Sequence, residues 1–350
     1  MIWTHRGRAL LSTALAAIAL CATALNADAK SKPQDDSVAT SAPSADAPGA
    51  TGLSPRLLED AAAYQAYLDR ATATSSAFTS AQSVSQALKT VAAYEVKALI
   101  RGAIAYGAVA ALDNPTFVAD VRAAGASPEN RRLILGYLAS DPGYALMFKG
   151  ADGAAGLAQQ AIGTAGLQLY AAGKSVKLSA YSIQHQAWSK QDIPDRPGRL
   201  SAVEAEGESA LQPAEDRVPA LERAASGAAP LPISAPPAQP PYTPLVARAV
   251  QLAAMAALGE AGDESYDRLT TLTVDDTTHT CLHIAKLNLY QCLAVAKPNY
   301  EDVFCMGQHV MMDTGSCLVK NVGLATPVEV TTTPMPAAVS IPAKKSHHSG

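Results

Sequence analysis

Residues 281–317 read CLHIAKLNLYQCLAVAKPNYEDVFCMGQHVMMDTGSC and hold four of the five cysteines in the chain. Cys281 and Cys292 are 11 positions apart. Because an α-helix turns by about 100° per residue, 11 steps amount to three turns plus about 20°. The spacing therefore predicts a helix that carries both thiols on one face.

Hydrophobic patterning indicates that this first helix is amphipathic. The face with the cysteines also carries Ile284 and Val295, whereas Lys286 falls on the opposite side. In an amphipathic helix the apolar arc faces the core and the charged arc faces solvent. We therefore expect Ile284 and Val295 to be buried and Lys286 to be exposed.

The run Lys297-Pro298-Asn299 marks a turn after the first helix. The residue before a proline resists the α conformation, so we expect the helix to end there. Asn299 is a favourable N-cap and is expected to begin a second helix. That helix should run to about Asp313, because Gly315 offers a stop signal.

The four cysteines of this stretch can pair in three ways. In an antiparallel hairpin, only the nested arrangement places both pairs side by side, with Cys281 joined to Cys317 and Cys292 joined to Cys305. Both of these pairs are centred on the same turn. The pattern resembles the twin-cysteine helical hairpins of the coiled-coil-helix family, with slightly longer spacings, and the resemblance covers this stretch alone.

The N-terminus has the layout of a secretory signal peptide. Residues 1–29 carry two arginines near the start, Arg6 and Arg8, continue with an apolar run and end in Ala27-Asp28-Ala29. We expect cleavage after Ala29 and export to the periplasm, an oxidising compartment in which disulfides form and persist. The alternatives are a retained membrane anchor, for which the apolar run is short, and lipidation at Cys21.

The composition is slightly acidic and poor in aromatic residues. The 27 basic and 31 acidic side chains give a formal net charge of −4, and no basic block is present. Nucleic-acid binding, which depends on clustered lysine and arginine, is therefore not expected. Hydrophobic residues, of which alanine is the commonest, make up 48% of the chain, and aromatic residues make up 5%. Such a core packs helices closely but buries little area, so we expect disulfides to add stability.

The chain as a whole predicts an all-α fold with an N-terminal helical bundle and a C-terminal disulfide-stapled helical hairpin unit. Several helices are expected to start where a capping residue precedes a proline, at positions 54–55, 114–115, 127–128 and 243–244. In order, we expect a signal peptide (1–29), a disordered tether (30–52), an alanine-rich helical bundle (53–190), an acidic and proline-rich linker (191–242), a disulfide-stapled helical unit (243–325) and a disordered tail (326–350).

Residues 153–173 carry no charged side chain and are long enough to span a bilayer. Their three glutamines make membrane insertion unfavourable. We therefore interpret this segment as a buried central helix whose glycines let neighbouring backbones approach. No transmembrane span is expected in the mature chain.

The segment from Asp141 to Ala165 resembles the first half of soluble lytic transglycosylases. Its GAAGLAQ run at 153–159 is similar to the Gly-Ala-x-Gly-Leu-Met-Gln motif of that family. The resemblance would make Asp141 the general acid that protonates a glycosidic oxygen. That family, however, has a glutamate followed by a serine, where this chain has Asp141 followed by Pro142. We expect Asp141 instead to cap the turn after it.

Met306, His309 and Met312 are spaced three residues apart and lie close to Cys305. Thioether and imidazole groups suit copper. A metal site at these residues is one interpretation. In the other, the methionines fill gaps in the core and Cys305 is consumed in a disulfide.

The sequence lacks a Gly-x-Ser-x-Gly elbow, a phosphate loop, a His-Glu-x-x-His pair and a dinucleotide fingerprint. We therefore expect an exported periplasmic or envelope-associated protein with a structural or interaction role, without catalytic residues or a cofactor. Its expected partner is an envelope protein or the cell wall. The alternatives are a peptidoglycan-associated protein with a degenerate lytic-transglycosylase-like segment and a periplasmic copper-binding protein.

Overall fold

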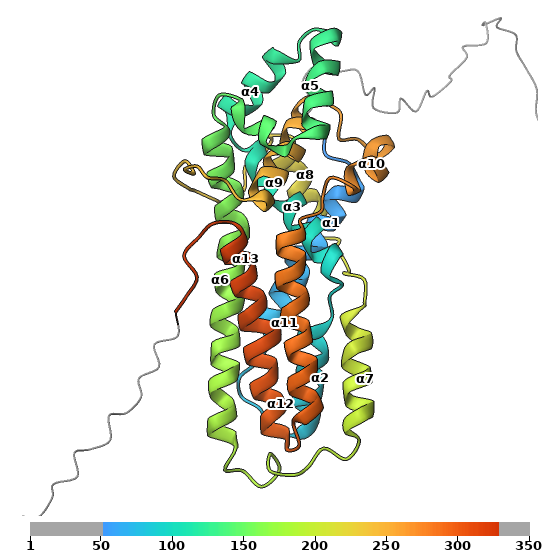
Figure 1. Ribbon diagram of the computed structural model, residues 1–350, viewed down its shortest axis with the longest axis vertical. Coiled ribbons are helices and arrows are strands. Elements are labelled where there is room, and N and C mark those ends of the chain that lie inside the picture. Colours follow the sequence, from blue (N-terminus) through green and yellow to red (C-terminus); the bar gives the residue numbers. More distant parts are fainter. Residues whose placement is uncertain (1–51, 329–350) are drawn as a thin grey trace, which may run out of the picture. The chain divides into compact units, whose positions relative to one another are not determined.

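The computed structural model describes residues 52–328, and Figure 1 shows that they fold into helices. Within this range there is no β-strand, and the extended segments form only two isolated bridges, Leu53 with Ala261 and Asp192 with Pro298. The predicted all-α fold is therefore confirmed. The predicted signal peptide, nearly all of the predicted tether and most of the predicted tail lie outside the described residues.

Thirteen α-helices, two 3-10 helices and one π-helix follow one another along residues 52–328. In chain order they are α1 (Pro55–Thr72), α2 (Ala81–Ala92), α3 (Val96–Leu112), α4 (Pro115–Ala124), α5 (Pro128–Ser140), η1 (Pro142–Met147), α6 (Ala151–Ile183), α7 (Arg196–Gly207), α8 (Val218–Ala225), α9 (Pro244–Ala257), η2 (Asp263–Ser265), α10 (Tyr266–Thr270), α11 (Asp276–Val295), α12 (Asn299–Cys305), the π-helix η3 (Met306–Asp313) and α13 (Thr314–Asn321).

Four helices begin at the predicted pairs of a capping residue and a proline. Ser54 Oγ accepts a hydrogen bond from the amide of Leu57 at 3.1 Å, which caps α1. The same geometry starts α4 after Asn114, α5 after Ser127 and α9 after Thr243. Proline costs nothing at the first helical position, because the amide it lacks has no intrahelical partner there. All four predicted helix starts are confirmed.

The centre of the core is α3, which packs against α1, α6 and α9. Most of its side chains are buried, and Leu99 and Ile104 are fully shielded from solvent. Small residues bring the neighbours close: a Cβ on Gly102 would lie 2.6 Å from the carbonyl oxygen of Asp60 on α1. The alanine-rich composition therefore corresponds to close helix packing.

The long helix α6 runs beside η3 and α13 (Figure 1). Two pairs of glycines, Gly166 with Gly315 and Gly173 with Gly307, lie between these helices. A Cβ on Gly315 would lie 2.6 Å from the carbonyl oxygen of Gly166, and a Cβ on Gly173 would lie 2.9 Å from the carbonyl oxygen of Gly307. We call these four residues the glycine seam, because only glycine permits backbones to approach so closely.

The uncharged segment 153–173 lies inside α6. Its alanines and its larger apolar side chains, such as Ile162 and Leu169, are largely buried in the protein. The segment is thus a central packing helix, as interpreted from the sequence. Among the helices of residues 52–328, none combines the length and the apolarity that crossing a bilayer requires.

The C-terminal hairpin consists of α11 and a second arm that comprises α12, η3 and α13. Disulfides join Cys281 to Cys317 and Cys292 to Cys305. The Cα atoms are 5.7 Å apart in both pairs, which is the usual separation for a disulfide. The pairing is therefore the nested one that the spacing predicted.

Two predicted details of the hairpin are wrong. Pro298 is the residue before α12, and Asn299 is its first helical residue; the side chain of Asn299 donates to the carbonyl oxygen of Gln191 at 2.9 Å instead of capping the helix. Gly315 does not end the second arm, which continues to Asn321. Because Gly315 lies against the backbone of α6, its missing side chain permits close packing and does not stop the helix.

The π-helix η3 explains how the two arms fit together although their cysteine spacings differ. The cysteines are 11 positions apart on α11 and 12 positions apart on the second arm. In a regular α-helix, 12 steps would leave the second thiol about 120° away from the first. A π-helix closes i→i+5 hydrogen bonds and so accommodates an extra residue. Because η3 lies between Cys305 and Cys317, both thiols face α11.

The orientation of α11 differs from the predicted one. Ile284 and Val295 are 49% and 73% exposed, whereas Lys286 is 4% exposed. The buried arc is centred on Leu282, Lys286 and Leu289, and it leaves the cysteines near its edge. The reason is that α11 packs against α3 and α7 as well as against the second arm. The predictions that Ile284 and Val295 are buried and that Lys286 is exposed are therefore wrong.

Residues 191–242, which were predicted to form a linker, contain two packed helices. α7 contacts α2 and α11, and α8 contacts α1 and α3. Val203 and Leu221 on these helices are buried. The proline-rich part after α8 lies along α6, where the amide of Ala238 donates to the carbonyl oxygen of Asp152 at 2.9 Å. This stretch therefore covers the bundle, and the described residues belong to one compact unit.

Candidate binding cleft

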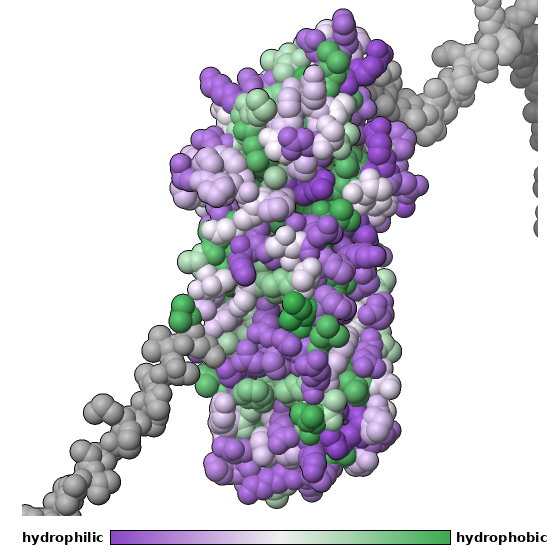
Figure 2. Space-filling model, in the orientation of Figure 1, coloured by the Kyte–Doolittle hydropathy of each residue, from purple (hydrophilic) through white to green (hydrophobic). Residues whose placement is uncertain are grey.

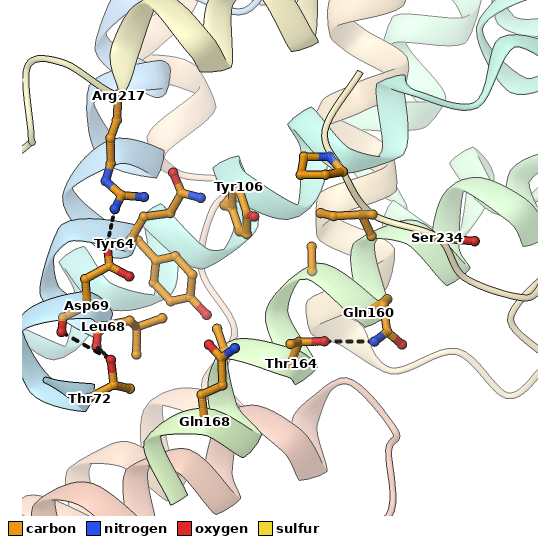
Figure 3. A pocket seen from close by; sticks show the side chains of 15 residues that line it. Tyr64, Leu68, Asp69, Thr72, Tyr106, Gln160, Thr164, Gln168, Arg217 and Ser234 are labelled. Atoms are coloured by element: carbon orange, nitrogen blue, oxygen red, sulfur yellow. Dashed lines mark hydrogen bonds and ion pairs between the residues drawn. The ribbon is translucent and has the colours of Figure 1, made fainter. Parts of the chain in front are cut away.

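A cleft of about 420 Å³ lies between α1, α3 and α6 and is bordered by the segment 232–234 (Figure 3). We call it the α1–α6 cleft. Its size is within the range of about 300–1,000 Å³ that small-molecule sites usually have. The polar side chains in its lining are Tyr64, Gln65, Asp69, Thr72, Tyr106, Gln160, Thr164, Gln168, Arg217 and Ser234.

Tyr64 on α1 lies at the floor of this cleft. Its side chain is fully shielded from solvent, and its hydroxyl has no hydrogen-bond partner among residues 52–328. Figure 3 shows the ring pointing from α1 towards Gln168 on α6. Burial raises the pKa of Tyr64, and the neighbouring Tyr106 adds to the rise, so the hydroxyl stays protonated. The cleft thus contains a neutral hydroxyl that can still donate and accept a hydrogen bond.

Tyr106 on α3 forms an aromatic wall beside Tyr64. The two ring centroids are 6.0 Å apart and the rings are tilted by 37°. Burial raises the pKa of Tyr106, while its hydrogen bond with Gln65 opposes the rise. Tyr106 is only partly buried, and its accessible part lines the cleft.

The charged groups of the lining are Asp69 on α1 and Arg217 just before α8, and they form an ion pair across the end of the cleft. Their side chains are 56% and 38% exposed. A pair so exposed adds little to stability because water screens it. The pairing matters more for a ligand, because each charge is already balanced by the other and neither is left to attract a charged ligand.

Neutral polar groups on α6 complete the lining. Gln160 Nε2 donates to Thr164 Oγ1 at 2.8 Å. Gln168, one turn further along α6, is exposed, and its side chain reaches towards the Tyr64 hydroxyl (Figure 3). Amides and hydroxyls both donate and accept hydrogen bonds. The cleft therefore offers many hydrogen-bonding groups without a net charge.

The rim of the cleft is held in place by Asp113, the residue after α3. Its Oδ2 accepts a hydrogen bond from the amide of Leu231 at 2.8 Å. Burial raises the pKa of Asp113, and the hydrogen bond from Leu231 opposes the rise. This contact anchors the proline-rich chain next to residues 232–234, which form one edge of the cleft.

The residues predicted as a metal site lie elsewhere, in η3 at the C-terminal hairpin. Met306 and Met312 are buried in the core, and Cys305 is in a disulfide. His309 Nδ1 lies 3.0 Å from Asp313 Oδ2 and forms an ion pair when the imidazole is protonated. Residues 52–328 contain no group of three or more histidine, cysteine, aspartate or glutamate side chains placed to hold a metal. Copper binding stays a prediction.

The segment that resembles lytic transglycosylases is used for capping and packing. Asp141 is exposed, and its Oδ1 accepts a hydrogen bond from the amide of Gly143 at 2.8 Å, as expected for a local cap. The GAAGLAQ run lies within α6. There, a Cβ on Gly156 would lie 2.2 Å from the carbonyl oxygen of Pro236, and Gln159 donates to the carbonyl oxygen of Val322 at 2.6 Å.

Lys286 is a buried cation that the sequence pattern placed on the surface. Its ammonium donates to the carbonyl oxygens of Tyr94 and Gly207 and lies 4.3 Å from the centroid of the Tyr94 ring. Burial lowers the pKa of Lys286 to about 8, while Glu208 and Glu95 oppose the shift. Nothing in the surrounding sequence distinguishes this lysine from a solvated one.

A second, more apolar cleft of about 410 Å³ lies beside the Cys292–Cys305 disulfide, at the C-terminal end of α6. Its lining includes the exposed side chains of Tyr181 and Val295 and the ring of Phe304. Figure 2 shows apolar side chains in separate patches among polar ones on the face that carries α11. This cleft contains few polar groups that could orient a ligand.

The chain matches no protein-family model, no curated protein and no solved structure.

Proposed function

We propose that this protein is exported to the periplasm and acts at the cell envelope by binding a partner. The observation that carries the proposal is the pair of nested disulfides that closes the C-terminal hairpin. Disulfides persist in oxidising compartments and are rare in reducing ones. The order of basic, apolar and small residues in the segment 1–29 supports the same compartment.

The binding role is supported by the chemistry of the α1–α6 cleft. A general acid or base must exchange its proton with the substrate. Asp69, the carboxylate of the lining, is instead paired with Arg217. The remaining polar groups are amides and hydroxyls, which are suited to holding and orienting a ligand.

The proposed partner is the cell wall or an envelope protein. The cell wall, and hence a peptidoglycan-associated role, is favoured by the neutral lining of the α1–α6 cleft, because glycan strands present hydroxyl and acetamido groups. The copper-binding role has less support. His309 is engaged by Asp313, and Met306 and Met312 are shielded within the core.

Cross-linking in intact cells tests the proposal. A photoreactive amino acid replaces Gln168, an exposed residue of the cleft, and the matched control carries it at the exposed Gln86 on α2. We expect irradiation to attach the Gln168 derivative, and not the Gln86 derivative, to cell-wall material or to one envelope protein. Recovery of the protein in the cytosolic fraction, with its cysteines alkylated before any reduction, would contradict the proposal.

A further inference from the structure

The lining of the α1–α6 cleft has no uncompensated charge. Asp69 and Arg217 balance each other at one end, and the other polar groups are amides and hydroxyls. An ion that enters a partly buried site without an opposite charge loses hydration that the site does not replace. The electrostatics therefore favour a neutral ligand.

The floor of the cleft has an unused hydrogen-bonding group. The Tyr64 hydroxyl is buried and has no partner within the described chain. A buried polar group without a hydrogen bond is unfavourable and calls for a partner. The labelled side chain next to it in Figure 3 belongs to Gln168, which is exposed. A ligand that displaces this side chain would gain the hydroxyl as a contact.

The remaining lining combines an aromatic surface with groups that both donate and accept. Tyr106 contributes part of its ring, and Gln160 and Thr164 contribute an amide and a hydroxyl on α6. A sugar ring matches such a lining. Its apolar C–H face packs on an aromatic ring, and its hydroxyls donate and accept in turn.

We propose that the α1–α6 cleft is a binding site for a neutral saccharide. Tyr64 and Gln168 contact the sugar through hydrogen bonds, and Tyr106 packs on its apolar face. The cleft volume of about 420 Å³ lies near the lower end of the range for small-molecule sites, so a short oligosaccharide segment fits it better than a large ligand. This inference rests on the proposed binding function and names the ligand class.

Isothermal titration calorimetry with the full mature chain, disulfides intact, tests the inference with two probes. Chitotriose in its fully N-acetylated form carries acetamido groups, and cellotriose carries hydroxyls alone. Binding of chitotriose alone supports the inference and indicates an acetamido-bearing glycan such as that of the cell wall. Equal binding of both probes also supports it and indicates recognition of the sugar hydroxyls.

Two variants locate the binding. Tyr64→Phe removes the buried hydroxyl and keeps the ring, and Gln168→Ala truncates an exposed side chain. We expect each to weaken binding of the probe about tenfold, as the loss of one hydrogen bond does. The matched control Gln86→Ala should bind as the original chain does. Tyr64→Phe should also leave the melting temperature of the free protein unchanged or raise it, because the hydroxyl has no partner to lose.

Three outcomes would overturn the inference. The first is that neither sugar binds. The second is that binding is unchanged in both Tyr64→Phe and Gln168→Ala. The third is that a trimer of glucuronic acid binds and the neutral sugars do not, which would refute the charge argument. The compartment and the cysteine state are measured separately, so the inference can fail while the proposed function stands.

Discussion

Raising the pH from 7 to about 9.5 should stabilise this protein through Lys286. The side chain is 4% exposed, and its ammonium donates to the carbonyl oxygens of Tyr94 and Gly207. Burial lowers its pKa from 10.5 to about 8, although Glu208 and Glu95 oppose the shift. The charged form is therefore less favourable in the folded protein than in the unfolded chain.

The sign and size of the effect can be worked out from these pKa values. Between about pH 8 and pH 10.5 the unfolded chain binds more protons at this lysine than the folded protein does, so the free energy of unfolding rises with pH. At about 1.4 kcal/mol per pKa unit, the gain from pH 7 to pH 9.5 is about 2 kcal/mol. Buried tyrosines oppose it. Burial raises the pKa of Tyr290 to about 12, so ionisation of tyrosine in the unfolded chain lowers stability above about pH 10.

Urea unfolding of the original chain and of Lys286→Met at several pH values separates these effects. Methionine keeps the length of the side chain and removes its charge, and every tyrosine is retained. The difference between the two unfolding free energies should therefore shift by about 2 kcal/mol in favour of the original chain from pH 7 to about pH 9.5. Identical pH dependence in the two proteins would refute a buried, cationic Lys286.

Three further predictions concern processing, packing and the Asp141 turn. Mass spectrometry of the native protein should find Lys30 as its first residue, and a chain that begins at Met1 would contradict export with cleavage. Gly173→Ala should lower the free energy of unfolding by about 1–3 kcal/mol, because its Cβ would lie 2.8 Å from the backbone nitrogen of Met312. The control Gly136→Ala, where nothing lies within 4 Å, should be neutral or stabilising by up to about 1 kcal/mol in the same urea titration. Asp141→Asn should cost at most about 1 kcal/mol, the size of a cap, and the purified protein should release no soluble muropeptides from cell-wall sacculi; digestion that this variant abolishes would instead identify Asp141 as a catalytic acid.

Local signals in the sequence were sufficient for the four helix starts at a capping residue followed by proline and for the disulfide pairing. A pair such as Ser54-Pro55 acts within three residues, so it works in the same way in any surrounding fold. The nested pairing depends on the turn at Pro298 and on the positions of the cysteines relative to it. Both are readable along the chain, because the two arms of the hairpin follow each other directly in the sequence.

Burial on α11 and the cleft could not be predicted in this way, because they depend on distant segments. The carbonyl partners of Lys286 are 192 and 79 positions away in the sequence, so nothing near the lysine indicates its burial. The α1–α6 cleft likewise combines Tyr64, Gln168 and Arg217 from separate parts of the chain. No motif links them, and only the packing of α1, α6 and the start of α8 brings them together.

The second arm of the hairpin contains one residue more than the stretches of α6 and α11 that face it. Gly307 and Gly315 are eight positions apart, yet they face Gly173 and Gly166, which are seven positions apart. The two cysteines of the second arm are likewise one position further apart than the two cysteines of α11. A single residue inserted within 306–313 accounts for both surpluses, because a π-turn stores it without rotating the helix beyond it. Deleting one residue from this stretch would let the arm form an ordinary α-helix with the same cysteines paired and the same glycines in contact.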